Sequence, residues 1–228
     1  MLVNPGLHGA VTSLKSVFTS IDGESCPYSY NFHLHTVYSD GQLRPEALIQ
    51  QAVAHGLKGL AITDHHTVAG YQAARRWLEH WNLQMSQQAL GPYLWCGVEI
   101  TALLLDIEVH ILGYSFDPDD PAMKPYLGGQ APSGEGRLAA RVIQAIQGAG
   151  GLAVLAHPVR YKKSPADLIP AAVRLGIDGV EAYYCYTNLD PWQPSPQQTQ
   201  QVKALGQAYG LLQTCGTDSH GMSILRRI

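Results

Sequence analysis

The chain has 228 residues, of which 46% are hydrophobic and 14% charged, with 23 glycines and 14 prolines. This length and composition fit one compact domain rich in tight turns and exclude a disordered protein. A formal net charge of −3 supplies no broad positive field, which argues against a surface for long duplex nucleic acid and leaves any phosphate affinity to local sites.

The cysteines and the apolar runs indicate the cellular compartment. Cys26, Cys96, Cys185 and Cys215 lie at least 30 residues apart and form no CxxC pair, which excludes a zinc ribbon. We expect buried, reduced thiols rather than disulfides. No continuous apolar run opens the chain, and none later approaches the length of a membrane span. The sequence therefore predicts a cytoplasmic protein with no membrane partner.

In chain order, residues 1–29 are predicted to be an extension, amphipathic at 11–18, that packs on the outside of a domain spanning residues 30–228. Within this domain, apolar runs of strand length alternate with helical patterns. The candidate strands cover residues 30–36, 57–63, 93–101, 107–114, 152–156, 178–182 and 211–216. The candidate helices cover residues 45–56, 68–88, 133–147, 166–175 and 196–209. This alternation is typical of α/β folds with parallel sheets, in which functional groups collect at the carboxyl ends of the strands.

Two connections stand out from this pattern. Residues 103–106 make a tight link between the third and fourth strands. Residues 117–136 are rich in Pro and Gly, which excludes long regular structure there and suits a lid. Ser133 is in position to cap the helix that follows.

The first candidate strand ends on His33 and His35. Side chains two residues apart on a strand point to the same face, so the two imidazoles project together, with Asp40 following in a Ser-Asp-Gly turn. They could hold one metal ion between them. Alone the pair is a weak signal, because a His-X-His pair is more often a surface or core feature than a ligand set.

Potential metal ligands gather at the predicted strand ends. They are His33, His35, His65, Glu99, His110, His157, Asp218 and His220. Each one singly is more readily explained as a hydrogen-bonded core or loop residue. Together, crowded imidazoles and acids in a core would leave polar groups unsatisfied at a cost of ~1–3 kcal/mol each, and metal ions remove that conflict. Imidazole favours Zn²⁺, Mn²⁺ or Fe²⁺, and the number of ligands exceeds what one ion needs. We expect two or three divalent ions, with Glu99 bridging, and hydrolytic chemistry.

Five nearby polar residues are expected to lie outside the ligand set. Asp64 precedes His65 and is expected to orient a metal-bound imidazole rather than to bind metal. Glu181 fits a pocket wall and a structural hydrogen bond equally well. Arg160 is in position to reach a phosphate, whereas the two lysines that follow it are better explained by solvation.

The motifs together resemble those of the PHP family, the polymerase and histidinol phosphatase superfamily. They are HLHTVYSDG at 33–41, TDHHT at 63–67, GVEIT at 97–101, VHILGY at 109–114, LAHP at 155–158 and GTDSHG at 216–221. The resemblance implies a distorted seven-stranded (β/α)7 TIM-like barrel with a trinuclear centre of Zn, Mn or Fe. The implied ligand sets are His33, His35, Glu99 and Asp218 for the first ion, Glu99, His110 and His157 for the second, and Asp40, His65 and His220 for the third. His66 departs from the family pattern, which often has an acid there.

The resemblance implies a phosphoesterase in which a metal-activated hydroxide attacks phosphorus. Asp40 or Asp218 is expected to accept a proton, and Arg160 to clamp the phosphate. The expected substrate is a small phosphomonoester or a nucleotide, such as a 3′,5′-bisphosphate or a short oligonucleotide end. Two alternatives remain open, an amidohydrolase-type hydrolase and a non-catalytic, metal-stabilised module.

Overall fold

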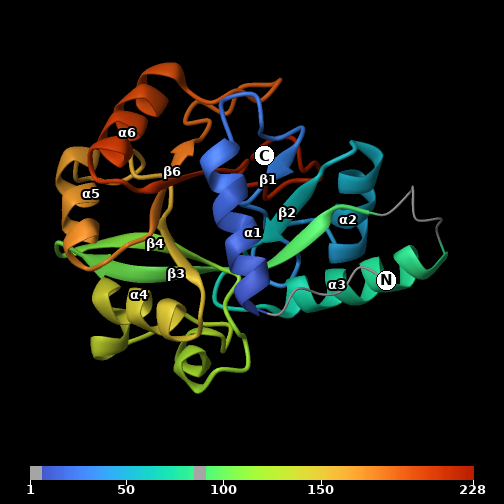
Figure 1. The fold of residues 1–228 in the computed structure, drawn as a ribbon, viewed down its shortest axis with the longest axis horizontal. Helices are drawn as coiled ribbons and strands as arrows, with labels where there is room; N and C mark the ends of the chain where they lie inside the picture. Colours follow the sequence, from blue (N-terminus) through green and yellow to red (C-terminus); the bar gives the residue numbers. More distant parts are fainter. Residues whose placement is uncertain (1–6, 85–90) are drawn as a thin grey trace.

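The computed structural model describes residues 7–84 and 91–228, and it forms one seven-stranded sheet in the order β1 to β7. The strands are β1 (Tyr30–Asn31), β2 (Gly59–Ile62), β3 (Tyr93–Leu104), β4 (Ile107–Tyr114), β5 (Leu152–Leu155), β6 (Gly179–Tyr183) and β7 (Leu212–Cys215). The helices are α1 (Leu7–Ser20), α2 (Pro45–Ala54), α3 (Ala69–Gln84), α4 (Ala139–Gly148), α5 (Pro165–Arg174) and α6 (Pro196–Ala208), with short 3-10 turns η2 (Pro121–Tyr126) and η3 (Gly134–Arg137). The helices surround the strands (Figure 1).

The first and last strands meet, so the sheet curls into a barrel. The Phe32 amide donates to the Cys215 carbonyl at 3.1 Å, the Asp218 amide to His33 at 2.8 Å, and the His35 amide to Ser219 at 3.1 Å. These bonds lie beyond the regular ends of β1 and β7 and continue their pairing. The seven-stranded α/β barrel expected from the sequence is confirmed.

The alternation of strands and helices predicted a parallel sheet, but the observed sheet is mixed. β4 is antiparallel to both β3 and β5. The cause is the link between β3 and β4, where Leu105 and Asp106 have φ values of 50° and 62°. Two residues with positive φ form a hairpin turn and are too few for a crossover to a parallel strand. Because β4 runs backwards, its first half lies at the same rim as the carboxyl end of β3, and this places His110 at that rim.

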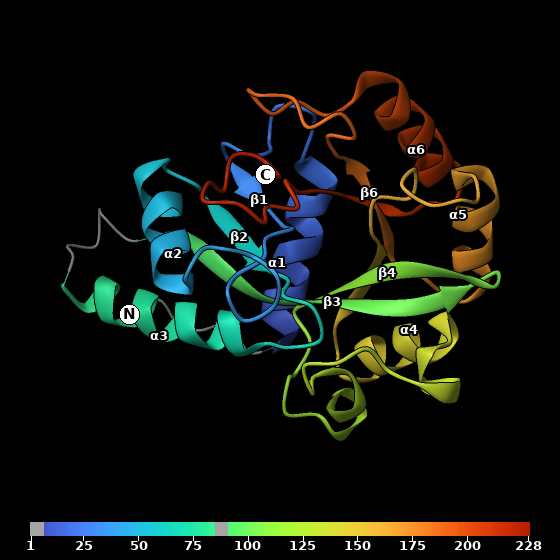
Figure 2. The same cartoon turned by 180° about the vertical axis from the view of Figure 1, so that it is seen from behind.

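Helix α1 packs onto the barrel through Leu14 and Phe18, which are 0% and 2% exposed. The Phe18 ring lies edge-on to Phe32 at 4.9 Å and to Tyr114 at 5.5 Å. The helix lies across the face seen in Figure 1, while the loop between β1 and α2 and the C-terminal segment lie toward the face seen in Figure 2.

Two helices have other bounds in the structure than the sequence predicted. The helix expected over 133–147 is split, because Leu138 is extended (φ −62°, ψ 131°) between η3 and α4, and Ser133 makes no side-chain capping bond. The helix expected over 68–88 runs over Ala69–Gln84, and residues 85–88 lie outside the described residues. Within the described ranges, no helix is both long and apolar enough to cross a membrane.

Candidate metal centre

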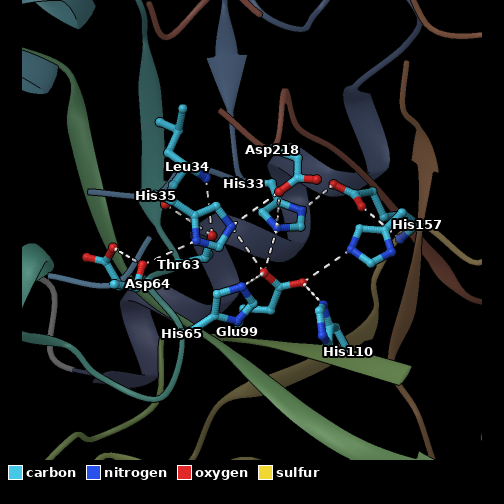
Figure 3. Close-up of polar contacts among 12 residues, drawn as sticks. His33, Leu34, His35, Thr63, Asp64, His65, Glu99, His110, His157 and Asp218 are labelled. Carbon is cyan, nitrogen blue, oxygen red and sulfur yellow. Dashed lines mark hydrogen bonds and ion pairs between the residues drawn. The ribbon is translucent and has the colours of Figure 1, made fainter. Parts of the chain in front are cut away.

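His33 and His35 are completely buried and converge on two carboxylates. Their Nε2 atoms lie 3.0 and 3.1 Å from Glu99 Oε2, and each lies 3.3 Å from Asp218 Oδ1 (Figure 3). Glu99 comes from β3, and Asp218 comes from the turn after β7, where its φ is 54° and its amide donates to the His33 carbonyl at 2.8 Å. The strand-end pair and the two acids therefore form one four-membered group.

The other oxygen of Glu99 serves a second set of imidazoles. Glu99 Oε1 lies 2.7 Å from His110 Nδ1 and 3.3 Å from His157 Nε2. His65 Nε2 lies 3.6 Å from Glu99 Oε2. Glu99 thus lies between five imidazoles from four segments of the chain, as a carboxylate that bridges two ions would.

Asp40 supplies the open side of the site. Its Oδ2 lies 3.2 Å from His220 Nε2 and 3.7 Å from His65 Nε2, and its Oδ1 lies 3.5 Å from His35 Nδ1. The Asp40 side chain is 54% exposed, whereas Glu99 and Asp218 are almost fully buried. Water and a substrate would reach the site from this side.

These residues fit divalent ions. Ligands about 2 Å from one ion lie roughly 3–3.5 Å from one another, close to the separations above. His35 Nε2 and His110 Nδ1 are buried without a hydrogen-bond partner, although carboxylate oxygens lie beside both. A cation between nitrogen and oxygen would satisfy both atoms.

The structure brings together all nine predicted ligands, but it groups them differently from the family pattern. Three sets are close enough to share an ion: His33, His35, Glu99 and Asp218; His35, Asp40, His65 and His220; and His65, Glu99 and His110. His35 and His65 each belong to two sets, and His157 approaches only through Glu99 Oε1.

Glu181 is a functional residue whose role the sequence left open. It is fully buried on β6, where its Oε1 accepts a bond of 2.9 Å from His33 Nδ1 and its Oε2 accepts one of 2.8 Å from the His157 amide. Because a carboxylate can only accept, a neutral His33 carries its proton on Nδ1 and turns the Nε2 lone pair toward the site. The sequence signal that could have identified Glu181 is an acid within a predicted apolar strand that neighbours the strands carrying ligands.

Among the described residues Asp64 makes no hydrogen bond to an imidazole, so the prediction that it orients a metal-bound imidazole directly is wrong. Its carboxylate accepts bonds of 2.7 Å from the Thr36 amide, the Thr36 hydroxyl and the Ser39 hydroxyl. Asp64 thereby fixes the turn that carries Asp40. His66 pairs with a residue outside the ligand set, because its Nε2 lies 3.1 Å from the Thr101 hydroxyl.

Asp218 has three donors on the oxygen that faces away from the histidines. Its Oδ2 accepts from Tyr184 Oη at 2.6 Å, Arg227 Nε at 2.8 Å and Arg160 Nη1 at 2.9 Å. The sequence singled out Arg160 as a phosphate ligand, and its side chain remains 37% exposed. Arg227 was missed, because no motif marks it and only the folding back of the C-terminal segment brings it here.

The charges of the site perturb its titration. Burial raises the pKa of Glu99, but the charges of His33 and His110 outweigh burial and hold it well below the usual range. Asp218 behaves likewise, with His33 and His35 as the opposing groups. Burial lowers the pKa of His35, yet the carboxylates of Asp218 and Glu99 raise it to about 9. Burial, helped by the charges of His35 and His110, lowers the pKa of His65 to about 4.

The chain resembles known proteins in both sequence and fold. The PHP domain model matches residues 31–117. A 5′-3′ exoribonuclease Rnm of Salmonella typhimurium is 38% identical over 50% of this chain and 38% of its own length. A 3′,5′-nucleoside bisphosphate phosphatase of Chromobacterium violaceum is 33% identical over 54% of this chain and 39% of its own length. The chain thus spans about two fifths of the length of these curated relatives.

Among solved structures, a protein of Bifidobacterium adolescentis assigned as a metal-dependent phosphoesterase superposes with a TM-score of 0.67. The superposition covers 86% of this chain and 89% of that one, at 24% identity. This likeness establishes the barrel fold.

Proposed function

We propose, from the premise that this chain is a member of the PHP superfamily, that it is a metal-dependent phosphoesterase acting on a small phosphomonoester or a nucleotide. The observation that carries the proposal is the environment of Glu99. Its two oxygens lie between 2.7 and 3.6 Å from five imidazole nitrogens, two of them buried and without a hydrogen-bond partner. Such a set makes chemical sense around two or three divalent ions.

Zn²⁺, Mn²⁺ or Fe²⁺ bound there would acidify water and take up charge on phosphoryl oxygens. The remaining tasks belong to side chains of this protein. Arg160 uses Nη1 to hold Asp218, and its other N–H groups, which have no partner among the described residues, are available to a phosphate. We assign the proton-accepting role to Asp40 rather than Asp218, because Asp40 is exposed and Asp218 Oδ2 already accepts three bonds.

The relatives support a substrate with a nucleotide character. One is named as an exoribonuclease and the other as a 3′,5′-nucleoside bisphosphate phosphatase. The acidic balance of this chain argues against long duplexes. We therefore propose a 3′,5′-bisphosphate nucleotide or the end of a short single strand as the substrate.

Replacing His33 and His35 together by alanine tests the proposal. The purified wild type should contain two or three divalent ions per chain by elemental analysis and should release phosphate from a panel of phosphate esters. The double variant should lose at least one ion, and its turnover should fall by more than the ~10–100-fold that loss of a ligand's hydrogen-bond partner costs, because the site loses two ligands of one ion. His55→Ala, an exposed histidine just after α2, is the matched control and should behave as the wild type.

Three outcomes would reject the phosphoesterase. Undiminished turnover by the double variant would place the chemistry elsewhere. Tight metal binding by a wild type that hydrolyses no ester would instead support the non-catalytic module. Turnover of amides or lactones in the same panel, without phosphate release, would support the amidohydrolase-type alternative.

A further inference from the structure

The loop between β1 and α2 presents exposed apolar surface beside the candidate metal centre. Val37 and Tyr38 are 49% and 48% exposed, and Tyr38 is two residues from Asp40 in the sequence. The Gln42 amide donates to the His220 carbonyl at 2.9 Å, so the loop also touches the segment that carries His220 (Figure 2). The loop that carries Tyr38 therefore borders the open side of the site, and the Tyr38 ring is half exposed rather than part of the core.

The backbone of this loop is fixed although these side chains are exposed. The Val37 amide donates to the Leu43 carbonyl at 3.0 Å, the Gly41 amide to Thr36 at 3.0 Å, and the Tyr38 amide to the Thr36 hydroxyl at 3.2 Å. Thr36 is in turn held by the buried carboxylate of Asp64. An exposed ring on a fixed backbone loses little entropy when a ligand stacks on it.

A groove of about 310 Å³ runs beside the ring and is lined by Val37, Tyr38, Arg44, Pro45 and Glu46. Neither the Arg44 guanidinium nor the Glu46 carboxylate makes a hydrogen bond or ion pair with another described residue. The groove thus offers one aromatic face, several N–H donors and one anionic acceptor. A planar heterocycle with both acceptors and donors on its edge matches this set, because its ring stacks on tyrosine and its edge pairs with arginine and glutamate.

We propose that this groove is a nucleobase subsite, in which Tyr38 stacks on the base of a nucleotide whose phosphate lies at the metal centre. The inference rests on the proposed function and deepens it, because it distinguishes a nucleotide from other phosphate esters. The position of Tyr38 supports it. Tyr38 and Asp40 share one turn, and their Cα atoms are at most about 7 Å apart, so the groove begins beside the residue on the open side of the site.

The test measures binding, so that it does not depend on turnover. Calorimetry of the metal-loaded protein compares two phosphonate analogues that cannot be hydrolysed, one of AMP and one of ribose 5-phosphate. The AMP analogue should bind the wild type ~10-fold or more tightly than the ribose analogue, since stacking of a base on an aromatic ring strengthens binding by about that factor or more. Tyr38→Ala should remove most of this preference, and Tyr38→Phe should retain it. Tyr209→Ala, which removes a tyrosine that is 44% exposed after α6, is the matched control and should also retain it.

A wild type with no preference for the AMP analogue would overturn the subsite, as would a Tyr38→Ala variant with the full preference. Failure of the proposed function looks different. A protein that prefers the AMP analogue but hydrolyses no phosphate ester would keep the subsite and lose the phosphoesterase. A protein that hydrolyses phosphate esters without preferring the AMP analogue would keep the phosphoesterase and lose the subsite.

Discussion

Glu181 is not an expected ligand, yet it determines which nitrogen of His33 faces the site. It accepts from His33 Nδ1 at 2.9 Å while fully buried. Glu181→Gln keeps the shape of the side chain and removes its charge, so the imidazole becomes a poorer donor of electrons to a metal. We expect the metal affinity of the first group to fall ~10–100-fold. Competition with a chromophoric chelator measures this affinity.

The control for Glu181 is Glu135→Gln, which alters an exposed acid in η3. It should leave the metal affinity within the error of the wild type. If Glu181→Gln also binds metal with full strength, the orientation of His33 does not depend on this carboxylate.

Tyr184 holds the side chain of Asp218 by a hydrogen bond, as Glu181 holds that of His33. Its hydroxyl donates to Asp218 Oδ2 at 2.6 Å, and the tyrosine is 1% exposed. Tyr184→Phe removes this bond to a buried charge and leaves the ring. The free energy of unfolding should fall by ~1.5–3 kcal/mol in urea denaturation at a fixed metal concentration. Tyr209→Phe, at a tyrosine 44% exposed, should change it by less than ~0.5 kcal/mol, and an equal loss in both variants would contradict the role of Tyr184.

At the scale of elements, the sequence could predict the strands because most of them are short apolar runs. β4 lies where it was expected, and β3 extends to Leu104. The direction of β4 was not predicted, because it depends on positive φ values at both Leu105 and Asp106, and leucine rarely adopts that conformation.

The same limit applies to the candidate site. Membership of the ligand set could be predicted because strand ends converge on one rim in a barrel. The partners of Asp64, Glu181 and Arg227 could not, because each contact joins segments between 9 and 148 residues apart. Such contacts leave no local pattern in the sequence.

The start of α3 shows how an element can control the site from outside. A Cβ at Gly70 would overlap Asp64 Oδ2 and lie 2.7 Å from the Thr36 hydroxyl. Gly70→Ala should push Asp64 off the turn that carries Asp40, which lowers the free energy of unfolding by ~1–3 kcal/mol and weakens metal binding. Gly148→Ala is the matched control, because nothing lies within 4 Å of its Cβ at the end of α4. Urea denaturation and elemental analysis of both variants check this, and equal stability and metal content would contradict it.

At the scale of the whole molecule, the fold gathers five imidazoles and two buried carboxylates around one point. The protein carries a formal charge of only −3, so this concentration of charge comes from topology rather than from composition. Without metal, protons on His33 and His35 balance the acids, since nearby carboxylates hold both pKa values above the ordinary range despite burial. Metal and protons therefore compete for the same nitrogens.

This competition predicts how the stability of the metal-free protein depends on pH. The pKa of His35 rises from 6.5 to about 9 on folding, so its contribution is complete below pH 6.5 and is lost as the pH rises through 9. The lowered pKa of His65 does not oppose this, because its contribution is already complete above pH 6.5. After chelation, the melting temperature should fall by roughly 5–10 °C between pH 6.5 and 9, for a loss on the order of 3 kcal/mol. Thermal scans in matched buffers measure it. His35→Gln should remove much of the fall, and added metal should stabilise more at pH 9 than at pH 6.5. A metal-free wild type whose melting temperature stays level or rises over this interval would show that the histidines do not hold these protons in the folded state.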